Sequence, residues 1–522
     1  MRPCGSVRSA VVVPSQSGKW ERFLETGYAP TKLYVHCEVT CELGLSVSAL
    51  QATGDQEDWR CESLGFLQSA GVLLRCRAEN KLFKPRMTFS SLDTLLGRFR
   101  GLGAVRIVIK PLAENDNTKQ QIYLGSSFEI LKVLPFESVK ATPGVKRPNF
   151  KAPMNLSWID AQGHVAPAQG TKLILYPDYP EVRLSGFLRG CPIAPSRLMQ
   201  PVPKAERQHN NGPDGRVLFL GIRPDGGVLA YVSASGSEVS RSFANLRANA
   251  AVVASGALWL LELVNTGNAR DALLQKLREI HTAGWHPSMR LDRTGRKIPY
   301  AAQNGGGYTL EALFGISPNG RSEPDYMGWE LKAFGSSRIT LMTPEPDTGF
   351  YGQHGTEAFV RKYGRDIGGG TTYFTGLHRV GLICAASGQV LRLDGFDPTK
   401  EKVVDVSGGI QLVDRLGQVS AGWSFADLID HWGRKHASAA YIPYEKKNDV
   451  LPEYFYGSPV LLGEKTTFPR YLKAMHDGHV VYDPGSKVTT EAGKSRVKAR
   501  SQFRISVKQL ACLYESLDRV DL

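Results

Sequence analysis

Four charged residues in one stretch of the sequence have the types and the spacing that metal-assisted chemistry requires. Asp325 follows a proline, and Glu330 and Lys332 come shortly afterwards in the apolar segment Gly328–Ala333. If that segment is a strand, Glu330 and Lys332 project from one face, because residues two apart point the same way. Glu311 precedes them on a separate amphipathic segment. The pattern is therefore Pro-Asp-x(n)-Glu-x-Lys with an accessory acid.

Hydrolysis of a phosphodiester bond is the reaction that suits this set. It needs a hard divalent cation that neutralises the phosphate and lowers the pKa of a bound water, and carboxylate oxygens hold such an ion. We expect Asp325 and Glu330 to be metal ligands, with Glu311 completing the acidic shell or holding a second ion. Lys332 is a compact cation that can orient or activate the water and stabilise charge on the phosphate.

The surrounding sequence predicts the elements that must position these side chains. Residues Tyr308 to Phe314 have apolar side chains at helical spacing and leave Glu311 on another side. The turn-forming residues Ser317 to Gly320 end that helix, and the expected strand Gly328–Ala333 follows. A bare Asp-x4-Glu-x-Lys spacing occurs by chance, but helix, turn and strand here stand in the order that the chemistry needs.

This part of the sequence resembles the MvaI/BcnI restriction endonucleases and their relative, the mismatch-repair nicking enzyme MutH, which share the PD-(D/E)xK fold. The resemblance rests on Tyr308-Thr309-Leu310-Glu311-x-Leu313-x-Gly315-Ile316, Pro324-Asp325 and Trp329-Glu330-Leu331-Lys332. Comparable stretches downstream are Ser337 to Leu341, Tyr363 to Arg365, Glu453 to Tyr456 and Arg500 to Ile505. The resemblance covers about the last 250 residues.

The resemblance implies a type II restriction-like endonuclease of a restriction or phage-defence system. It implies cleavage of double-stranded DNA with Mg²⁺, for which Mn²⁺ would substitute. In these terms Asp325 and Glu330 are metal ligands, Lys332 positions the water, and Glu311 is the accessory acid. The resemblance also favours a monomer and a methyltransferase or defence-system partner.

Two other functions remain open at this stage. A single catalytic centre cuts one strand per engagement, so a partner-dependent nicking nuclease of the MutH type is one alternative. A catalytically inert DNA-binding module is the other. The joint presence of Asp325, Glu330 and Lys332 argues against the inert module, because a decayed site usually lacks at least one of them.

Further residues are candidates for contact with DNA. His431 and His436 follow one another at a spacing that does not share a helical face, so we expect a base or phosphate contact from one of them rather than a metal site. Lys498, Arg500 and Arg504 lie at even spacing and would form a basic face on a strand. A merely solvated face is the plain alternative for these three basic residues.

The fold class that the sequence predicts is an α/β domain, α+β with a mixed sheet, of restriction-endonuclease type, preceded by mixed and mainly β domains. We expect a mixed α/β accessory domain over residues 1–136, a Pro-rich basic linker over 137–153, a mainly β accessory domain over 154–260 and the nuclease domain over 261–522.

Individual elements of these domains are also predicted. Ser91 to Phe99 is expected to be a helix capped by serine, and Asp271 to His281 an amphipathic helix ending before Gly284. The expected strands are Val105–Ile109, Thr171–Tyr176, Glu181–Phe187, Arg216–Ile222 and Gly227–Val232.

Composition and charge agree with a globular protein that binds a polyanion. The chain has 522 residues, with 64 Lys and Arg against 50 Asp and Glu, a net charge of +14. Neutralising phosphates with such residues releases condensed counterions, which favours binding to nucleic acid. The longest apolar run, Ala257–Val264, is too short to cross a bilayer. We expect a cytoplasmic protein with no membrane partner.

The eight cysteines are sparse and do not have the spacing of a disulfide framework. His36, Cys37, Cys41, Cys61 and Cys76 could together close a zinc site, but reduced, buried thiols are the favoured interpretation.

Overall fold

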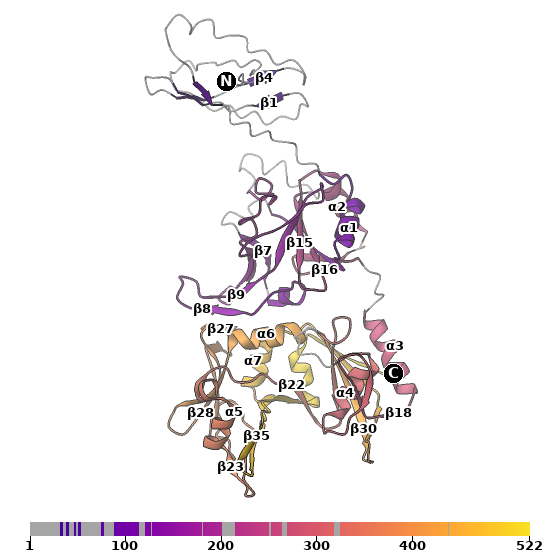
Figure 1. Cartoon of the computed structure of the whole chain (residues 1–522), viewed down its shortest axis with the longest axis vertical. Helices are drawn as coiled ribbons and strands as arrows, with labels where there is room; N and C mark the ends of the chain where they lie inside the picture. Colours follow the sequence, from indigo (N-terminus) through magenta and orange to yellow (C-terminus); the bar gives the residue numbers. More distant parts are fainter. Residues whose placement is uncertain are drawn as a thin grey trace, which may run out of the picture. The chain divides into compact units, whose positions relative to one another are not determined.

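The computed structural model divides into two compact units, Met1–Arg86 and Met87–Leu522. In the first unit it describes only short strands, and in the second it describes residues 88–113, 121–126, 128–179, 181–200, 215–249, 252–263, 269–317, 324–436 and 438–522. Figure 1 shows these elements along the chain.

The strands described in the first unit form two small antiparallel sheets. β1 (Lys32–Tyr34) pairs with β4 (Gln51–Thr53), and β2 (Glu38–Thr40) pairs with β3 (Ser46–Ser48) and β5 (Arg75–Arg77). The side chains of the possible zinc site lie outside the described residues.

The second unit begins with a seven-stranded sheet that is covered on one face by helices α1 (Leu92–Gly101) and α2 (Glu238–Ala248). Ser91 caps α1 by accepting a hydrogen bond from the Thr94 N–H, as the sequence predicts. In pairing order the strands are β11 (Val165–Pro167), β10 (Leu156–Ile159), β15 (Val228–Ser233), β14 (Val217–Ile222), β6 (Arg106–Pro111), β17 (Leu258–Glu262) and β16 (Val253–Ser255).

The opposite face of this sheet packs into a core that it shares with a five-stranded antiparallel sheet. In pairing order the strands of the second sheet are β7 (Gln121–Gly125), β13 (Glu181–Ser185), β12 (Lys172–Tyr176), β9 (Asn149–Pro153) and β8 (Lys140–Thr142). The short 3-10 helix η2 (Phe128–Lys132) follows β7.

The structure differs from the expected boundary at residues 137–153. These residues form β8 and β9 rather than an unstructured connection. In addition, β6 from before this segment pairs with β14 and β17 from after it. Strands from both expected accessory domains therefore share one sheet.

The C-terminal part of the second unit is built around β30 (Ser438–Lys447). It pairs in parallel with β21 (Glu330–Phe334) and antiparallel with β31 (Glu453–Tyr456) and β32 (Val460–Glu464). The sheet is completed by β18 (Trp285–Pro287) and β37 (Ser516–Val520). Helices α3 (Ala269–Thr282) and α4 (Gly305–Leu313) share a core with these strands.

Smaller sheets and three helices form the rest of this part. The helices are α5 (Gly349–Tyr363), α6 (Phe425–Lys435) and α7 (Phe468–His476), and the 3-10 helix η4 covers Val507–Leu513. The paired strands are β19 (Met289–Leu291) with β20 (Lys297–Pro299); β22 (Arg338–Met342), β36 (Phe503–Ser506) and β33 (Val480–Tyr482); β23 (Arg365–Asp366), β24 (Thr371–Thr375), β34 (Gly485–Glu491) and β35 (Lys494–Lys498); β25 (Val390–Asp394), β28 (Gly409–Val413) and β29 (Val419–Ser424); and β26 (Phe396–Asp397) with β27 (Lys402–Val403).

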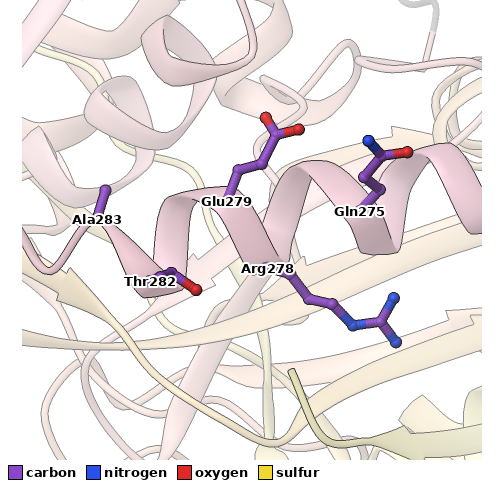
Figure 2. Close-up of a pocket in the computed structure, with 5 residues that line it drawn as sticks. All are labelled: Gln275, Arg278, Glu279, Thr282 and Ala283. Atoms are coloured by element: carbon purple, nitrogen blue, oxygen red, sulfur yellow. The ribbon is translucent and has the colours of Figure 1, made fainter.

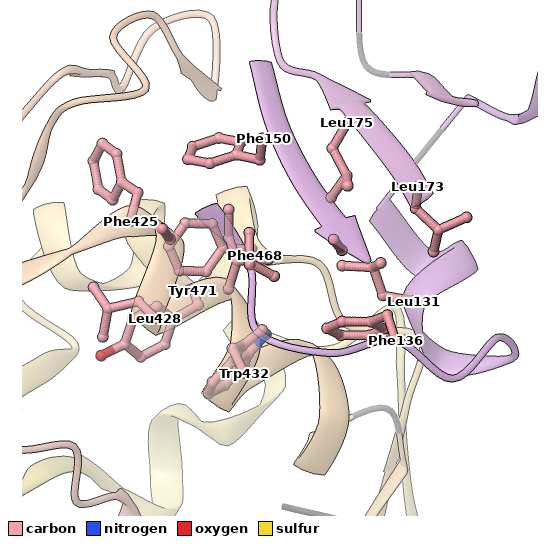
Figure 3. Close-up of a cluster of buried hydrophobic side chains, with 14 of the residues drawn as sticks. Leu131, Phe136, Phe150, Leu173, Leu175, Phe425, Leu428, Trp432, Phe468 and Tyr471 are labelled. Carbon is pink, nitrogen blue, oxygen red and sulfur yellow. The ribbon is translucent and has the colours of Figure 1, made fainter. Parts of the chain in front are cut away.

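One hydrophobic core joins the two parts of the second unit. Figure 3 shows Leu131, Phe136 and Phe150 gathered with Phe425 and Trp432 of α6 in a single buried cluster. The Lys132 ammonium also donates to the carbonyl of Thr466, 2.7 Å away. Within the described residues, no helix is long and apolar enough to cross a membrane.

Candidate active site

A tight hairpin places Asp325 beside Leu331, the second residue of β21. Tyr326 and Trp329 exchange backbone hydrogen bonds of 2.9 and 2.8 Å, and the two residues between them, Met327 and Gly328, have φ values of 47° and 89°. Two-residue hairpin turns of this hand need positive φ at both central positions. The chain therefore reverses at once, and the Asp325 Oδ2 accepts a hydrogen bond of 2.9 Å from the N–H of Leu331.

Glu330 and Lys332 project from the same face of β21, as their spacing predicts. The Lys332 ammonium donates to Glu330 Oε1 at 2.6 Å. The Glu330 side chain is 3% exposed and that of Lys332 is 19% exposed. The second carboxylate oxygen of Glu330, Oε2, is buried without a hydrogen-bond partner. A buried ionised oxygen without a donor is unfavourable, so this atom is available to a cation.

The charges of the three predicted acids all act on Lys332. Burial disfavours the ammonium and would lower its pKa, yet the pKa of Lys332 is raised above its ordinary value. Glu330 contributes most to this increase, and Asp325 and Glu311 add to it. Lys332 is therefore a stable cation in the presence of three carboxylates.

Helix α4 supplies Glu311 from the neighbouring layer. The helix packs on the same core as β21. It also lies close to β31, because the Tyr456 hydroxyl donates to the carbonyl of Gly306 at 2.7 Å. Burial raises the pKa of Tyr308, and the negative charge of Glu311 raises it further. The charge of Glu311 thus acts on Tyr308, Tyr456 and Lys332, whose pKa values it helps to raise.

A pair of tyrosines, which no sequence motif predicts, lies beside Glu330. Tyr441 lies opposite Lys332 in the parallel pairing of β21 with β30, and its hydroxyl is 2.7 Å from that of Tyr514. Burial raises the pKa of both hydroxyls, and the charge of Glu330 contributes to each increase. Both tyrosines are therefore neutral neighbours of the carboxylate, and no local motif marks them.

The donor types at this site suit a hard divalent cation, since all three acids offer carboxylate oxygens. The unpartnered Oε2 of Glu330 fits the same interpretation. Within the described ranges, however, no three His, Cys, Asp or Glu side chains lie close enough together to hold a metal ion. Asp325 is instead bonded to the backbone of β21, and Glu330 to Lys332.

A surface hollow lies elsewhere in this part of the chain, along helix α3. Figure 2 shows its lining side chains, which are Gln275, Arg278, Glu279, Thr282 and Ala283. None of the predicted catalytic residues lines it, and its residues come from successive turns of one helix. We assign it no role in the chemistry.

The two candidate histidines on α6 lie in different environments. His431 is 37% exposed and is 3.6 Å from Asp427. His436 is buried, with its ring stacked on Trp432 and Nε2 within 3.1 Å of the carbonyl of Leu341. The expected DNA contact from His436 is therefore not available in this conformation, because the side chain is part of the core.

The three candidate basic residues near the C-terminus also lie in different environments. Lys498 is exposed at the end of β35, and Arg500 is half-buried just after it. Arg504 lies on β36, on the face opposite the buried Phe503 and Ile505, and its guanidinium donates to Asp483 at 2.8 Å. Lys498 and Arg500 thus keep a surface position, whereas Arg504 has a structural partner.

The site contains a buried carboxylate that is paired with a lysine, and two further acids whose charges act on that lysine. This set of groups is typical of a hydrolase that acts on an anionic substrate. The sequence of this region identifies the class more closely. Residues 274–514 match the family described as "MvaI/BcnI restriction endonuclease family", which confirms the resemblance seen in the motifs. This match indicates a DNA-cleaving phosphodiester hydrolase, with a C-terminal region of restriction-endonuclease type in a mixed α/β fold.

Solved structures and curated sequences add little to this match. The structure titled "Restriction endonuclease MvaI-cognate DNA substrate complex" is 17% identical, with a TM-score of 0.39 over 49% of this chain and 99% of that one. "Restriction endonuclease MvaI in the absence of DNA" is 15% identical, with a TM-score of 0.28 over 49% and 98%. No curated protein matches the sequence.

Proposed function

We propose that this chain is a metal-dependent endonuclease that hydrolyses phosphodiester bonds in double-stranded DNA, in a restriction or phage-defence role. The observation that carries the proposal is the buried, unpartnered Oε2 of Glu330 beside the cationic Lys332. This pair lies on a strand within the region that matches the endonuclease family. A partner-dependent nicking enzyme is the second candidate, because one catalytic centre cuts one strand at a time.

The proposal assigns the acids to a divalent ion, Mg²⁺ with Mn²⁺ as a substitute. Asp325 and Glu330 would hold it, and Glu311 would complete the shell or hold a second ion. When bound, such an ion neutralises charge on the scissile phosphate and makes a nearby water more acidic. The hydrogen bond from Leu331 N–H to Asp325 keeps that carboxylate next to the strand before any ion arrives.

Lys332 acts in this proposal as a cation rather than as a base. Its raised pKa keeps the ammonium protonated at neutral pH, so it cannot accept a proton from water in this state. Its three N–H donors can instead orient the water and stabilise charge that accumulates on the phosphate. Its short bond to Glu330 sets the position of the ammonium at the site.

Plasmid cleavage with Mg²⁺ and with EDTA tests the proposal, using the wild-type chain, Asp325→Ala and Lys332→Ala. Linear DNA formed only by the wild type and only with Mg²⁺ is the expected result. Nicked circles without linear DNA would favour the nicking enzyme. DNA binding without cleavage by the wild type under every condition would overturn both and leave the inert module.

The remaining expectations are also proposals. Lys498 and Arg500 are proposed to contact phosphates, and His431 to contact a base edge or phosphate when its interaction with Asp427 opens. The enzyme is proposed to act as a cytoplasmic monomer with a cognate methyltransferase or another defence protein. Residues 1–260 are proposed to have an accessory role, without the boundary that was expected at residues 137–153.

A further inference from the structure

The five-stranded sheet of residues 121–185 has one buried face and one outward face. Leu173, Leu175, Val182 and Leu184 lie on the buried face and are at most 1% exposed. Side chains alternate across a strand, so the residues between them point outward. The outward face lies outside the region that matches the endonuclease family.

Three basic residues, Lys140, Lys151 and Arg183, lie along one row across this face, which also holds Ile174, 5% exposed, and ends at Tyr123. The register places Lys140 opposite Lys151, Lys151 opposite Ile174, Ile174 opposite Arg183, and Arg183 opposite Tyr123. Lys172 shares the face, two residues before Ile174 on β12. We call this set the outer basic face: Lys140, Lys151, Lys172, Arg183 and the neighbouring loop residues Lys146 and Arg147.

The lysines of the outer basic face have no acidic counterparts. Within the part of the chain that the structure describes, Lys140, Lys151 and Lys172 take part in no ion pair, whereas Arg183 binds Glu181 at 2.9 Å. Like charges directly opposite one another on adjacent strands destabilise a sheet. Lys140 and Lys151 stand in that relation, so this arrangement is unfavourable until a polyanion covers it.

Aromatic rings lie among these cations. Arg147 lies over the ring of Tyr179 at 5.8 Å, and Arg183 over that of Tyr176 at 5.7 Å. Tyr179 is 62% exposed and Tyr123, at the edge of the row, is 36% exposed. Basic side chains interleaved with aromatic rings on a flat sheet are suited to a nucleic-acid backbone, with the rings available to sugars or bases.

We propose that the outer basic face binds the phosphate backbone of DNA at a second position, away from Glu330 and Lys332. The partner is identified by charge: lysines that form no ion pair, of which Lys140 is exposed and Lys151 and Lys172 are half-buried, can contact a regular series of phosphates. The proposal rests on DNA being the substrate of this chain, but not on any metal or catalytic step. The accessory region would then add affinity and extend the length of DNA that the enzyme holds.

The test measures binding of labelled DNA by the full-length chain in EDTA at several salt concentrations. The variant is Lys140→Ala/Lys151→Ala/Lys172→Ala. The matched control, Lys276→Ala/Lys465→Ala/Lys473→Ala, removes the same charge from lysines that lie within 4.0 Å of carboxylates. A duplex and a single strand of equal length are both used as probes.

Each lost phosphate contact lowers the slope of log affinity against log salt by about 0.9 for duplex DNA and about 0.7 for a single strand. We therefore expect the slope of the outer-face variant to fall by up to about 2.7 on duplex, while the control keeps the wild-type slope. A larger loss on the single strand would assign the face to unpaired DNA.

Equal slopes for the outer-face variant and the control would overturn the proposal. Competition by polyglutamate as effective as competition by duplex DNA would also overturn it, because the partner would then be an acidic protein. Thermal unfolding checks that the triple variant folds, and Lys140→Gln/Lys172→Gln serves if it does not. Binding in EDTA is independent of cleavage, so failure of this proposal is distinguishable from failure of the nuclease assignment.

Discussion

The two carboxylate oxygens of Glu330 have different environments. Oε1 accepts the Lys332 ammonium at 2.6 Å, whereas Oε2 is buried and has no partner. An oxygen in that position costs stability unless charge reaches it, and a divalent ion is the group that the nearby acids could retain there. Substitution at Glu330 should therefore separate catalysis from folding.

Glu330→Gln keeps the size of the side chain and removes its charge. We expect cleavage to fall by about 100-fold or more, because an ion contributes several kcal/mol to charge stabilisation and each 1.4 kcal/mol is tenfold in rate. The melting temperature should change little, since acids clustered without their ion repel one another. Initial cleavage rates and thermal unfolding measure the two effects. Glu279→Gln on the surface is the control, and an unfolded Glu330→Gln would make Glu330 structural.

The pKa of Lys332 gives a second expectation at this scale. It is raised above 10.5 in the folded chain, so the stability that this charge contributes is present below that pH and is lost only as the pH rises through the raised value. Between about pH 6 and 9 the charge of Lys332 should therefore make no contribution to the pH dependence of the free energy of unfolding, which denaturant titration at several pH values measures.

In Glu330→Gln the pKa of Lys332 should fall, because burial would then be opposed by one carboxylate fewer. The pH dependence of acylation at Lys332, followed by mass spectrometry, reports this change. Acylation that begins at the same pH in both proteins would contradict the role that we assign to Glu330.

At the scale of elements, the hairpin before β21 decides where Asp325 lies. Its two central residues both have positive φ, and only Gly328 adopts that conformation without strain. Met327 has φ of 47° and is an unusual residue for it. The conformation of Met327 thus lowers local stability, while the turn holds Asp325 against the backbone of Leu331.

Gly328→Ala should lower both stability and cleavage. A Cβ at φ of 89° costs about 1 kcal/mol or more, and any relaxation of the turn moves Asp325 from its bond with Leu331. Met327→Asn is the matched variant, because asparagine tolerates this conformation; it should keep activity and gain a few tenths of a kcal/mol. Thermal unfolding and cleavage rates measure both. Full activity in Gly328→Ala would show that the hairpin does not position the acid.

The elements that sequence could predict are those with local signals. Ser91 and Gly284 mark helix ends, and α1 and α3 lie where the caps and apolar periodicity indicate, with Gly284 at φ of 82°. Glu330 and Lys332 share a face because a strand alternates regardless of its partners. These features depend on few neighbours in the chain.

Other features depend on pairings between distant segments, which one sequence does not reveal. Tyr441 and Tyr514 meet beside Glu330 only because β30 and the end of η4 come together in the fold. His436 is buried because it packs between Trp432 and β22, where its Nε2 lies 3.1 Å from the carbonyl of Leu341. In β9 a weak local signal was present: Phe150 and Ala152 alternate with Lys151, which indicates a half-buried strand rather than a linker.

At the scale of the whole second unit, the accessory strands and the family-matched region share a core. Leu131, in η2, is 4% exposed, and Gly433 of α6 lies against it, so a Cβ there would be 3.6 Å from Leu131 Cδ1. Figure 3 shows the surrounding aromatic side chains of both parts. A shared core of this kind should make residues 87–522 unfold together.

Leu131→Ala should weaken that cooperativity. Truncating a buried leucine costs about 2 to 5 kcal/mol, and here the lost contacts join the two parts. We expect calorimetry to show one transition of this unit in the wild type and two in the variant, with limited proteolysis separating the two parts earlier. Leu273→Ala is the control, since it opens a cavity in the core under α3; it should shift the transition without dividing it. A single transition in both variants, with the transition temperature lowered equally, would contradict this expectation. It would show that the accessory region does not unfold as a separate part and that the contacts of Leu131 have no special role.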